Sequence, residues 1–538
     1  MHSYLLIMTR KILLSSFFTF FFACIFAAPI GKDKALRIAK DFMSQKGVAI
    51  DSKLSIAYSP QAKPLAVQSP TTRTGRQVMS AQKLYYVINN GQDKGYIVIA
   101  GDDRVAPILA FSAVGAMTQE AIERHPSIHY MYEEYQRQIQ WAIEHMPDKP
   151  VLTTRASDYK ILIQPLLEYD NDRQTRLPQA ISWGQSWPFN QYAPNYNYQG
   201  TVYPTVSGCV ATGISTVLRW HKWPNHPHGS TNYWWKGRYL MSLNFDGNGP
   251  ENAAYDWANM PAAVTSGGYN RETGQPLNET QADNIGRLLR DVGYSVQMDY
   301  NPAFTGGSGA YVFNAPTALS EHFGYKRSVR FLERSNYTDN AWLNHVYNEL
   351  KDYGPVVYTG FSQGGGHCFV LDGFASNGFV HVDWGWNRSQ NGWHLLNVLK
   401  PGQEGIGGGY GGYSSNQQML RYLEPDGQDV NPNPNPRPNP NPNPQPEKKS
   451  NLYIYGNKPH YTISVGESKT VVINVGNNGN DSFVGYLSLS VYKDDNDAYS
   501  TLVDEQYTLI GAGYYRPLEF SFKNYNLARQ VVVFEGKL

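Results

Sequence analysis

The spacing of apolar residues predicts a helix and two strands in the middle of the chain. In SGCVATGISTVLRWHKWP, apolar side chains recur at helical spacing from position 210, and a proline follows the run. This pattern predicts an amphipathic helix and places Cys209 at or just before its first turn. Two apolar runs flank a glycine-rich turn further on, which predicts a buried strand at 355–358 and a second strand at 367–371.

The patterns at the two ends of the chain predict further folded units. Residues 29–155 combine a helical start, strands near 84–112 and an amphipathic helix at 128–146. The repeat NPNPNPRPNPNPNPQP at 431–446 has low complexity and predicts an extended spacer without a core. Beyond it, apolar and polar residues alternate with period two between turn signals, which predicts a β-sandwich.

The first residues have the pattern of an export signal. Arg10 and Lys11 precede the apolar run ILLSSFFTFFFACIFAA at 12–28, which is short for a transmembrane helix. We expect cleavage near the end of this run. Phe-Phe-Ala is a poor context for lipid attachment at the following Cys24, so we expect no lipid anchor.

Length and charge narrow the class of protein. A chain of 538 residues is long enough for three or four folded units. It carries 46 basic and 45 acidic residues, so charge gives no reason to expect nucleic acid or a charged membrane surface as partner. Aromatic residues make up 14% of the chain, which favours packed loops and β-structure over helical bundles.

The cysteines point to chemistry rather than to a disulfide. Once the signal is removed, Cys209 and Cys368 remain, and a bridge between them is the simplest interpretation in an oxidising compartment. Neighbouring side chains on a strand point to opposite faces, however, so Cys368 should face the core if His367 faces a cleft. A helix start favours a thiolate at Cys209, and a histidine about 150 residues downstream matches the chain order of papain-like cysteine proteases.

Four motifs make this resemblance specific. GCVATGISTVLRWHKWP, GGGHCFVLDGF, HVDWGWNRSQNGWHLLNVLKP and GIGGGYGGYSSNQ occur in the order of the streptopain family of secreted bacterial cysteine proteases. The segment at 84–112 resembles the prodomain of that family. The resemblance covers roughly residues 30–425.

The resemblance implies roles for individual positions. It implies that Cys209 is the nucleophile and that His367 is the general base and acid. Gln185 stands at the family's oxyanion-hole glutamine, which acts with the backbone N–H of Cys209; such a donor is worth about 2.7 to 4 kcal/mol in comparable enzymes. Trp384 stands where the family's tryptophan packs against the catalytic histidine. Asp383 replaces an asparagine of the family, and a carboxylate there would favour the imidazolium.

The resemblance also implies the overall design. We expect a secreted or cell-surface cysteine endopeptidase of α+β class, made as a zymogen and without a cofactor. Its papain-like two-lobed catalytic domain would follow an α+β prodomain and precede a Pro/Asn-rich linker and an all-β sandwich. The expected bounds are 1–28 for the signal peptide, 29–155 for the inhibitory prodomain, 156–428 for the catalytic domain, 429–449 for the linker and 450–538 for the sandwich.

Partners and activation follow from the same resemblance. The expected partners are protein and peptide substrates and the chain's own prodomain as an intramolecular inhibitor, with no nucleic acid and no membrane span. Activation is expected by cleavage between about residues 147 and 175, where proline and polar residues predict an exposed linker. QPLL at 164–167 resembles the start of mature chains of the family.

Other interpretations stay open at this point. The chain could be an adhesin or binding protein whose protease fold has lost activity, since Asp383 is atypical and the C-terminal unit resembles an interaction module. His221, His226 and His228 lie close together in sequence, but no cysteine or acidic residue lies nearby, so we expect no zinc site. DDND at 494–497 lacks the glycine and the glutamate of a calcium-binding loop.

Overall fold

The computed structural model describes most of the first 427 residues and the strands of the C-terminal unit. The described ranges are 29–50, 53–63, 82–146, 159–337, 339–362, 365–396, 417–427, 452–454, 467–477, 483–492, 500–510, 515–523 and 531–537. Four segments named in the sequence analysis lie outside these ranges: the expected signal peptide, the motif GIGGGYGGYSS at 405–415, the Asn-Pro repeat and DDND.

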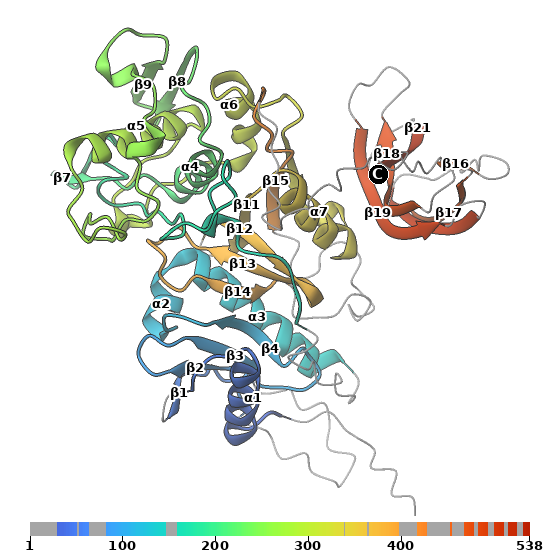
Figure 1. Ribbon diagram of the computed structural model, residues 1–538. Coiled ribbons are helices and arrows are strands. Elements are labelled where there is room, and N and C mark those ends of the chain that lie inside the picture. The colour runs from blue at the N-terminus through green and yellow to red at the C-terminus, as the bar shows by residue number, and fades with distance from the viewer. Residues whose placement is uncertain are drawn as a thin grey trace, which may run out of the picture.

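The N-terminal region is an antiparallel sheet with helices on both faces (Figure 1). Tyr85 and Val87 pack in the same cluster as the helix residues 128–142, whereas Tyr86 and Ile88 pack with the first helix. Because both faces are covered, the strands at 85–90, 96–100 and 108–112 are buried along their whole length. The elements are α1 (Lys32–Gln45), β1 (Leu54–Tyr58), β2 (Tyr85–Asn90), β3 (Tyr96–Ala100), β4 (Ile108–Ser112), α2 (Gln119–Arg124) and α3 (Pro126–His145).

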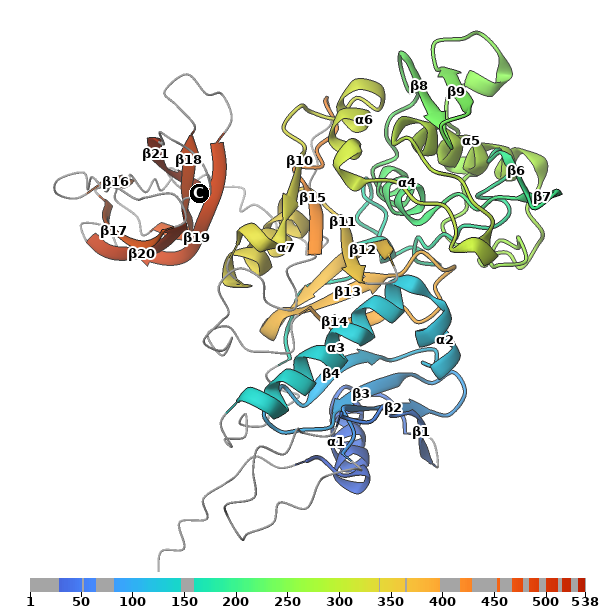
Figure 2. The same cartoon turned by 180° about the vertical axis from the view of Figure 1, so that it is seen from behind.

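The following region has two lobes, one built around two helices and the other around a sheet (Figures 1 and 2). The helical lobe contains β6 (Asn195–Tyr198), β7 (Thr201–Pro204), α4 (Cys209–His221), β8 (Ser230–Trp235), β9 (Tyr239–Asn244), α5 (Glu279–Ser295) and α6 (Ala315–His322). The sheet lobe contains β10 (Arg330–Glu333), α7 (Asp339–Asp352), β11 (Val356–Ser362), β12 (Gly365–Ala375), β13 (Phe379–Asp383), β14 (Gly392–Leu395) and β15 (Gln417–Arg421).

A single sheet joins the N-terminal region to the sheet lobe. The strand order is β1-β2-β3-β4-β14-β13-β12-β11-β15-β10, and the junction is the antiparallel pair β4 and β14. At that junction Trp393 lies opposite Phe111 and His394 lies opposite Ala110. In both views α3 lies close to this junction (Figures 1 and 2). The two regions therefore share backbone hydrogen bonds as well as side-chain contacts.

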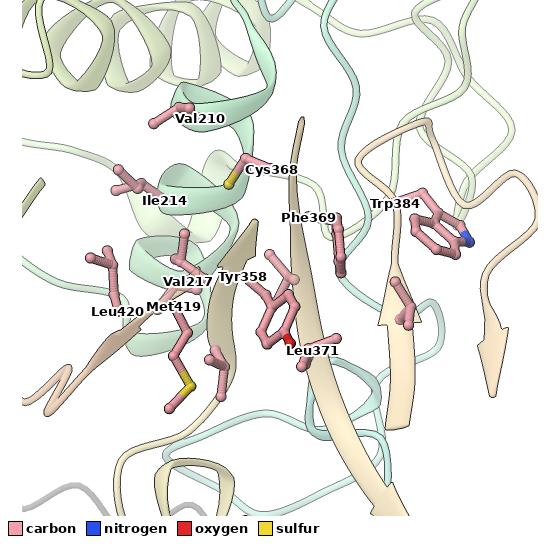
Figure 3. Packing of buried hydrophobic residues seen from close by; sticks show 14 of the residues in the cluster. Val210, Ile214, Val217, Tyr358, Cys368, Phe369, Leu371, Trp384, Met419 and Leu420 are labelled. Atoms are coloured by element: carbon pink, nitrogen blue, oxygen red, sulfur yellow. The ribbon is translucent and has the colours of Figure 1, made fainter. Parts of the chain in front are cut away.

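Helix α4 packs against β12 at the interface of the two lobes. Its Val210, Ile214 and Val217 are buried, as the apolar spacing predicts. The side chain of Cys368 is directed at this helix, where a β-carbon on Gly213 would lie 3.0 Å from its sulfur (Figure 3). The predicted helix start at Cys209 is confirmed, and β11 and β12 are longer than the predicted strands.

The segment expected to be an exposed linker is partly built into the sheet lobe. β5 (Ile161–Ile163) pairs with β12, and the backbone N–H of Leu167 donates to Asp372 at 3.1 Å. Leu166 and Leu167 are buried and belong to the hydrophobic cluster that also contains Trp220 and Phe374. Residues 159–167 are therefore tied to the sheet lobe by their backbone, although the side chains of Ile161 and Leu162 are exposed, and residues 147–158 lie outside the described ranges.

The C-terminal unit consists of two antiparallel sheets, in agreement with the predicted β-sandwich. The strand orders are β16-β17-β20 and β19-β18-β21. Val471, Ile473 and Val475 alternate with exposed residues and form a core with Leu518 and Phe520. The strands are β16 (Leu452–Ile454), β17 (Ser468–Asn477), β18 (Phe483–Tyr492), β19 (Ser500–Ile510), β20 (Tyr515–Lys523) and β21 (Val531–Lys537).

Candidate active site

Cys209 occupies the first position of α4. Gly208 precedes it with φ of 89°, a conformation that favours glycine. A β-carbon at Gly208 would also press against Met298 and the carbonyl of Ser308. The carbonyl of Gly208 accepts the N–H of Thr212 at 3.0 Å, which closes the first helical turn. The tight turn thus presents the thiol at the end of the helix where unpaired N–H groups gather.

The thiol of Cys209 lies between the two lobes and is half-buried. The backbone N–H of Cys368 donates to its sulfur at 3.4 Å. Burial raises the pKa of the Cys209 thiol, while the N–H groups of Cys368, Cys209 and Val210 oppose that shift. In this form of the protein the thiol is therefore protonated at neutral pH.

His367 lies on the face of β12 opposite to Cys368. Its cross-strand partner is Gly360, and a β-carbon at Gly360 would overlap the ring of Tyr130 from α3. Directly opposed residues of an antiparallel pair share one face, so the imidazole is on the side that α3 covers. Burial, followed by the charge of His129 on α3, lowers the pKa of His367 to about 4. The imidazole is thus held neutral.

Cys209 and His367 are not brought into contact. No hydrogen bond between the thiol and the imidazole occurs among the described residues, although the thiol contacts β12 at Cys368, the residue next to His367. The sulfur is instead bonded to the backbone of the residue after His367. A thiolate–imidazolium pair would require the imidazole to turn away from α3.

Gln185 is fixed beside the start of α4. Its carbonyl accepts the N–H of Ser207 at 3.1 Å, two residues before Cys209. The hydroxyl of Thr212 donates to the carbonyl of Gly184 at 3.2 Å. Gln185 is 7% exposed, so little freedom remains for its amide. The backbone at Gln185 is thus tied to the segment that leads into α4.

Asp383 and Trp384 stabilise the loop after β13. One Asp383 oxygen accepts the N–H of Gly385 at 2.8 Å, and burial raises the pKa of this carboxyl to about 6. The ring of Trp384 packs against Phe369 and His394, with centroids 5.1 and 4.9 Å away. Phe369 shares the face of β12 that carries the catalytic-histidine candidate, so Trp384 lies along that face. The expected packing of Trp384 on the imidazole itself does not occur among the described ring contacts.

Two histidines at the start of α3 that the sequence did not single out, the capping residue His125 and the helical residue His129, border the site. The ring of His125 lies 4.8 Å from that of Trp386, and His129 lies one helical turn further along, close enough to influence the charge of His367. Their contacts join segments far apart in the sequence, and no local pattern marks them. Tyr130 is fully buried against β11 in the same region.

The three-histidine segment after α4 has structural contacts. The two ring nitrogens of His221 lie 2.6 Å from the hydroxyl of Tyr325 and 3.1 Å from the carbonyl of Tyr353. His226 donates a ring N–H to the carbonyl of Asn252 at 2.6 Å. These bonds occupy both ring nitrogens of His221 and one of His226.

A thiol at a helix start, an imidazole on the adjacent strand and a glutamine beside the helix are the components of a cysteine protease. Comparison with known proteins agrees. The peptidase C10 family profile matches residues 183–394, and the Spi protease inhibitor profile matches residues 27–139. Streptopain of Streptococcus pyogenes is 30% identical over 65% of this chain and 83% of its own length.

Thiol protease/hemagglutinin PrtT of Porphyromonas gingivalis is 27% identical over 74% of this chain. The match spans 42% of the length of that relative. A solved fragment of prointerpain A from Prevotella intermedia is 25% identical, with a TM-score of 0.48, over 68% of this chain and 99% of the fragment. The chain belongs to the peptidase C10 family of cysteine endopeptidases. No described helix is both long and apolar enough to cross a membrane.

Proposed function

We propose that this chain is the zymogen of an exported cysteine endopeptidase in which Cys209 and His367 form the catalytic dyad. The observation that carries the proposal is the thiol at the start of α4, surrounded by three backbone N–H groups and adjacent to the strand that bears the imidazole. Family membership supports the same reaction class.

The reaction would proceed through an acyl-enzyme. After His367 turns toward α4, it takes the thiol proton, and the Cys209 thiolate attacks the scissile carbonyl carbon. The amide of Gln185 and the N–H of Cys209 would stabilise the developing oxyanion. The imidazolium then gives its proton to the leaving amine as the C–N bond breaks. A water molecule, deprotonated by His367, hydrolyses the thioester and restores the thiol.

Helix α3 would keep the zymogen silent. It covers the face of β12 on which His367 lies, with Tyr130 against Gly360 and His129 near the imidazole. The N-terminal region that contains α3 would thus act as an intramolecular inhibitor, which the match to Spi protease inhibitors supports. Activation requires that α3 leave this face.

The activating cleavage is proposed to fall before Tyr159. From this residue onward the backbone is tied to the sheet lobe, where Lys160 and Ser376 exchange two hydrogen bonds of 2.7 and 2.8 Å. A protease needs an extended, accessible backbone, which β5 and the buried Leu166 do not offer. The proposed window is therefore residues 147–158.

The test is to purify the full chain beside its Cys209→Ala variant. If the enzyme processes itself, the variant stays at full length, and a trace of active enzyme converts it in trans. Maturation of the variant at the unchanged rate in a protease-free preparation would refute self-processing. If neither the full chain nor a processed form hydrolyses any peptide, the protease proposal fails.

A further inference from the structure

The turn after Trp384 is fastened to the segment that carries Gln185. Asn387 donates its backbone N–H to the carbonyl of Trp183 at 3.0 Å and its side-chain amide to the carbonyl of Val264 at 2.8 Å. A β-carbon at Gly184 would overlap the Asn387 side chain. This turn therefore has a fixed position beside the proposed oxyanion-hole residue.

The same turn lies on the histidine side of the site. The ring of Trp386 contacts that of His125, the residue that caps the start of α3, and His129 in the first turns of this helix is close enough to His367 to influence its charge. Trp386 and His367 therefore both border the N-terminal end of α3. Because the imidazolium protonates the leaving amine, the substrate segment downstream of the cut would pass over this turn.

Two guanidinium groups gather at this turn. Arg271 donates to the carbonyl of Asn387 at 2.9 Å, and Arg388 donates to the side-chain carbonyl of Gln179 at 3.0 Å. Burial and then the neighbouring charge of Arg388 lower the pKa of Arg271, which shows that the two cations lie close together. In the part of the chain that the structure describes, neither forms an ion pair with a carboxylate.

This arrangement leaves two positive charges without a counter-charge. Their hydrogen bonds go to neutral carbonyl oxygens, which orient the guanidinium groups but do not neutralise them. Arg271 is exposed and Arg388 is half-buried, so a ligand can reach at least one of them from solvent. A guanidinium has five N–H donors, and both groups keep donors for a planar carboxylate.

We infer that Arg271 and Arg388 form a subsite that binds a carboxylate of the substrate downstream of the scissile bond. The inference rests on the proposed protease function and adds a preference on the leaving-group side. The carboxylate could belong to an Asp or Glu side chain or to the C-terminus of a short substrate. In the zymogen, His125 covers the adjacent Trp386, so the subsite would become fully accessible on activation.

The experiment compares matched peptides with the processed enzyme. In the first set, each peptide carries either Glu or Gln at one position just after the cut, and every peptide ends in an amide. In the second set, these positions all carry Gln, and each peptide ends in a free carboxylate. We expect kcat/KM to be about fivefold higher for Glu than for Gln at one position, and this ratio to fall at high ionic strength. The second set shows whether a C-terminal carboxylate raises kcat/KM as much as a Glu side chain does.

Variants test whether the two arginines cause the preference for Glu over Gln. Arg271→Gln and Arg388→Gln should each bring the Glu to Gln ratio close to one, and Arg388→Glu should favour Lys at that position. The matched control is Arg238→Gln, an exposed arginine at the end of the β8–β9 hairpin, which should keep the wild-type ratio. Thermal unfolding checks that each variant is folded.

The outcomes separate failure of the inference from failure of the proposed function. Equal cleavage of the Glu, Gln and free-carboxylate peptides by an active enzyme would overturn the subsite. A ratio that persists in both arginine variants would overturn it as well. If the wild-type protein cleaves neither these peptides nor a peptide that carries a coumarin amide as its leaving group, the protease function itself fails.

Discussion

Removal of the N-terminal region should change the reactivity of Cys209 in a pH-dependent way. In the zymogen, burial holds the thiol pKa above its ordinary value of 9.0, and that of His367 is about 4. Between about pH 5 and 6 the zymogen therefore contains a neutral thiol and a largely neutral imidazole. After processing, a Cys–His pair would lower the thiol pKa to about 3 to 4, as in other proteases.

The size of the change depends on the pH of the measurement. At pH 5 the thiolate fraction would rise from about one in 10,000 or less to nearly one. The less basic thiolate is intrinsically a weaker nucleophile, which costs about 200-fold for a pKa difference of about five. The net acceleration is about 50-fold at pH 5. At pH 7 the gain in thiolate is only about 100-fold, so the two effects nearly cancel.

The assay is reaction with a small neutral disulfide reagent in a Cys368→Ala background. With the expected signal segment and its Cys24 removed, the remaining reactive thiol is Cys209. Rates are measured from pH 4 to 8 for the full-length protein and for the processed protein. Equal rates at pH 5 would refute the reasoning, because they would mean that α3 does not control the state of the dyad.

Three further predictions follow from other contacts of the site. Gln185→Ala should lower kcat by about 100- to 1,000-fold with a smaller change in KM, as measured on the processed enzyme. Gly360→Ala should make the added methyl overlap Tyr130, destabilise the zymogen by about 1–3 kcal/mol and accelerate processing, as followed by thermal unfolding and gel electrophoresis. Asp383 has a pKa raised from 3.8 to about 6, so its ionisation reduces stability as pH rises through that interval. The melting temperature of Asp383→Asn relative to that of the wild type should therefore rise between pH 4 and pH 6. A difference in melting temperature that stays constant over this interval would contradict the prediction.

Local patterns predicted the elements that carry the site. The apolar spacing after Gly208 gave the start of α4, because a helix with one buried face must repeat its apolar residues every three or four positions. Strand alternation gave the opposite orientations of His367 and Cys368, because that property belongs to the strand itself.

Contacts between distant segments could not be predicted in this way. The packing of Tyr130 on Gly360 depends on how α3 lies across the assembled sheet, and neither residue carries a local sign of it. The pairing of β5 with β12 has the same origin, since a strand of three residues is too short for a periodic pattern. The pKa of Asp383 could not be predicted from the sequence either, because its rise to about 6 comes from burial of the carboxyl in the folded chain.

The sheet shared through β4 and β14 bears on how the chain folds. The N-terminal strands are synthesised first, and β4 can present its edge before β14 exists. Tyr132 and Tyr135 of α3 belong to the same hydrophobic cluster as Val210 and Trp384, so the protease core is completed by a region that the proposed activation would remove. The processed enzyme should therefore owe its lifetime to slow unfolding rather than to a favourable folding equilibrium, and it should refold poorly without its N-terminal region.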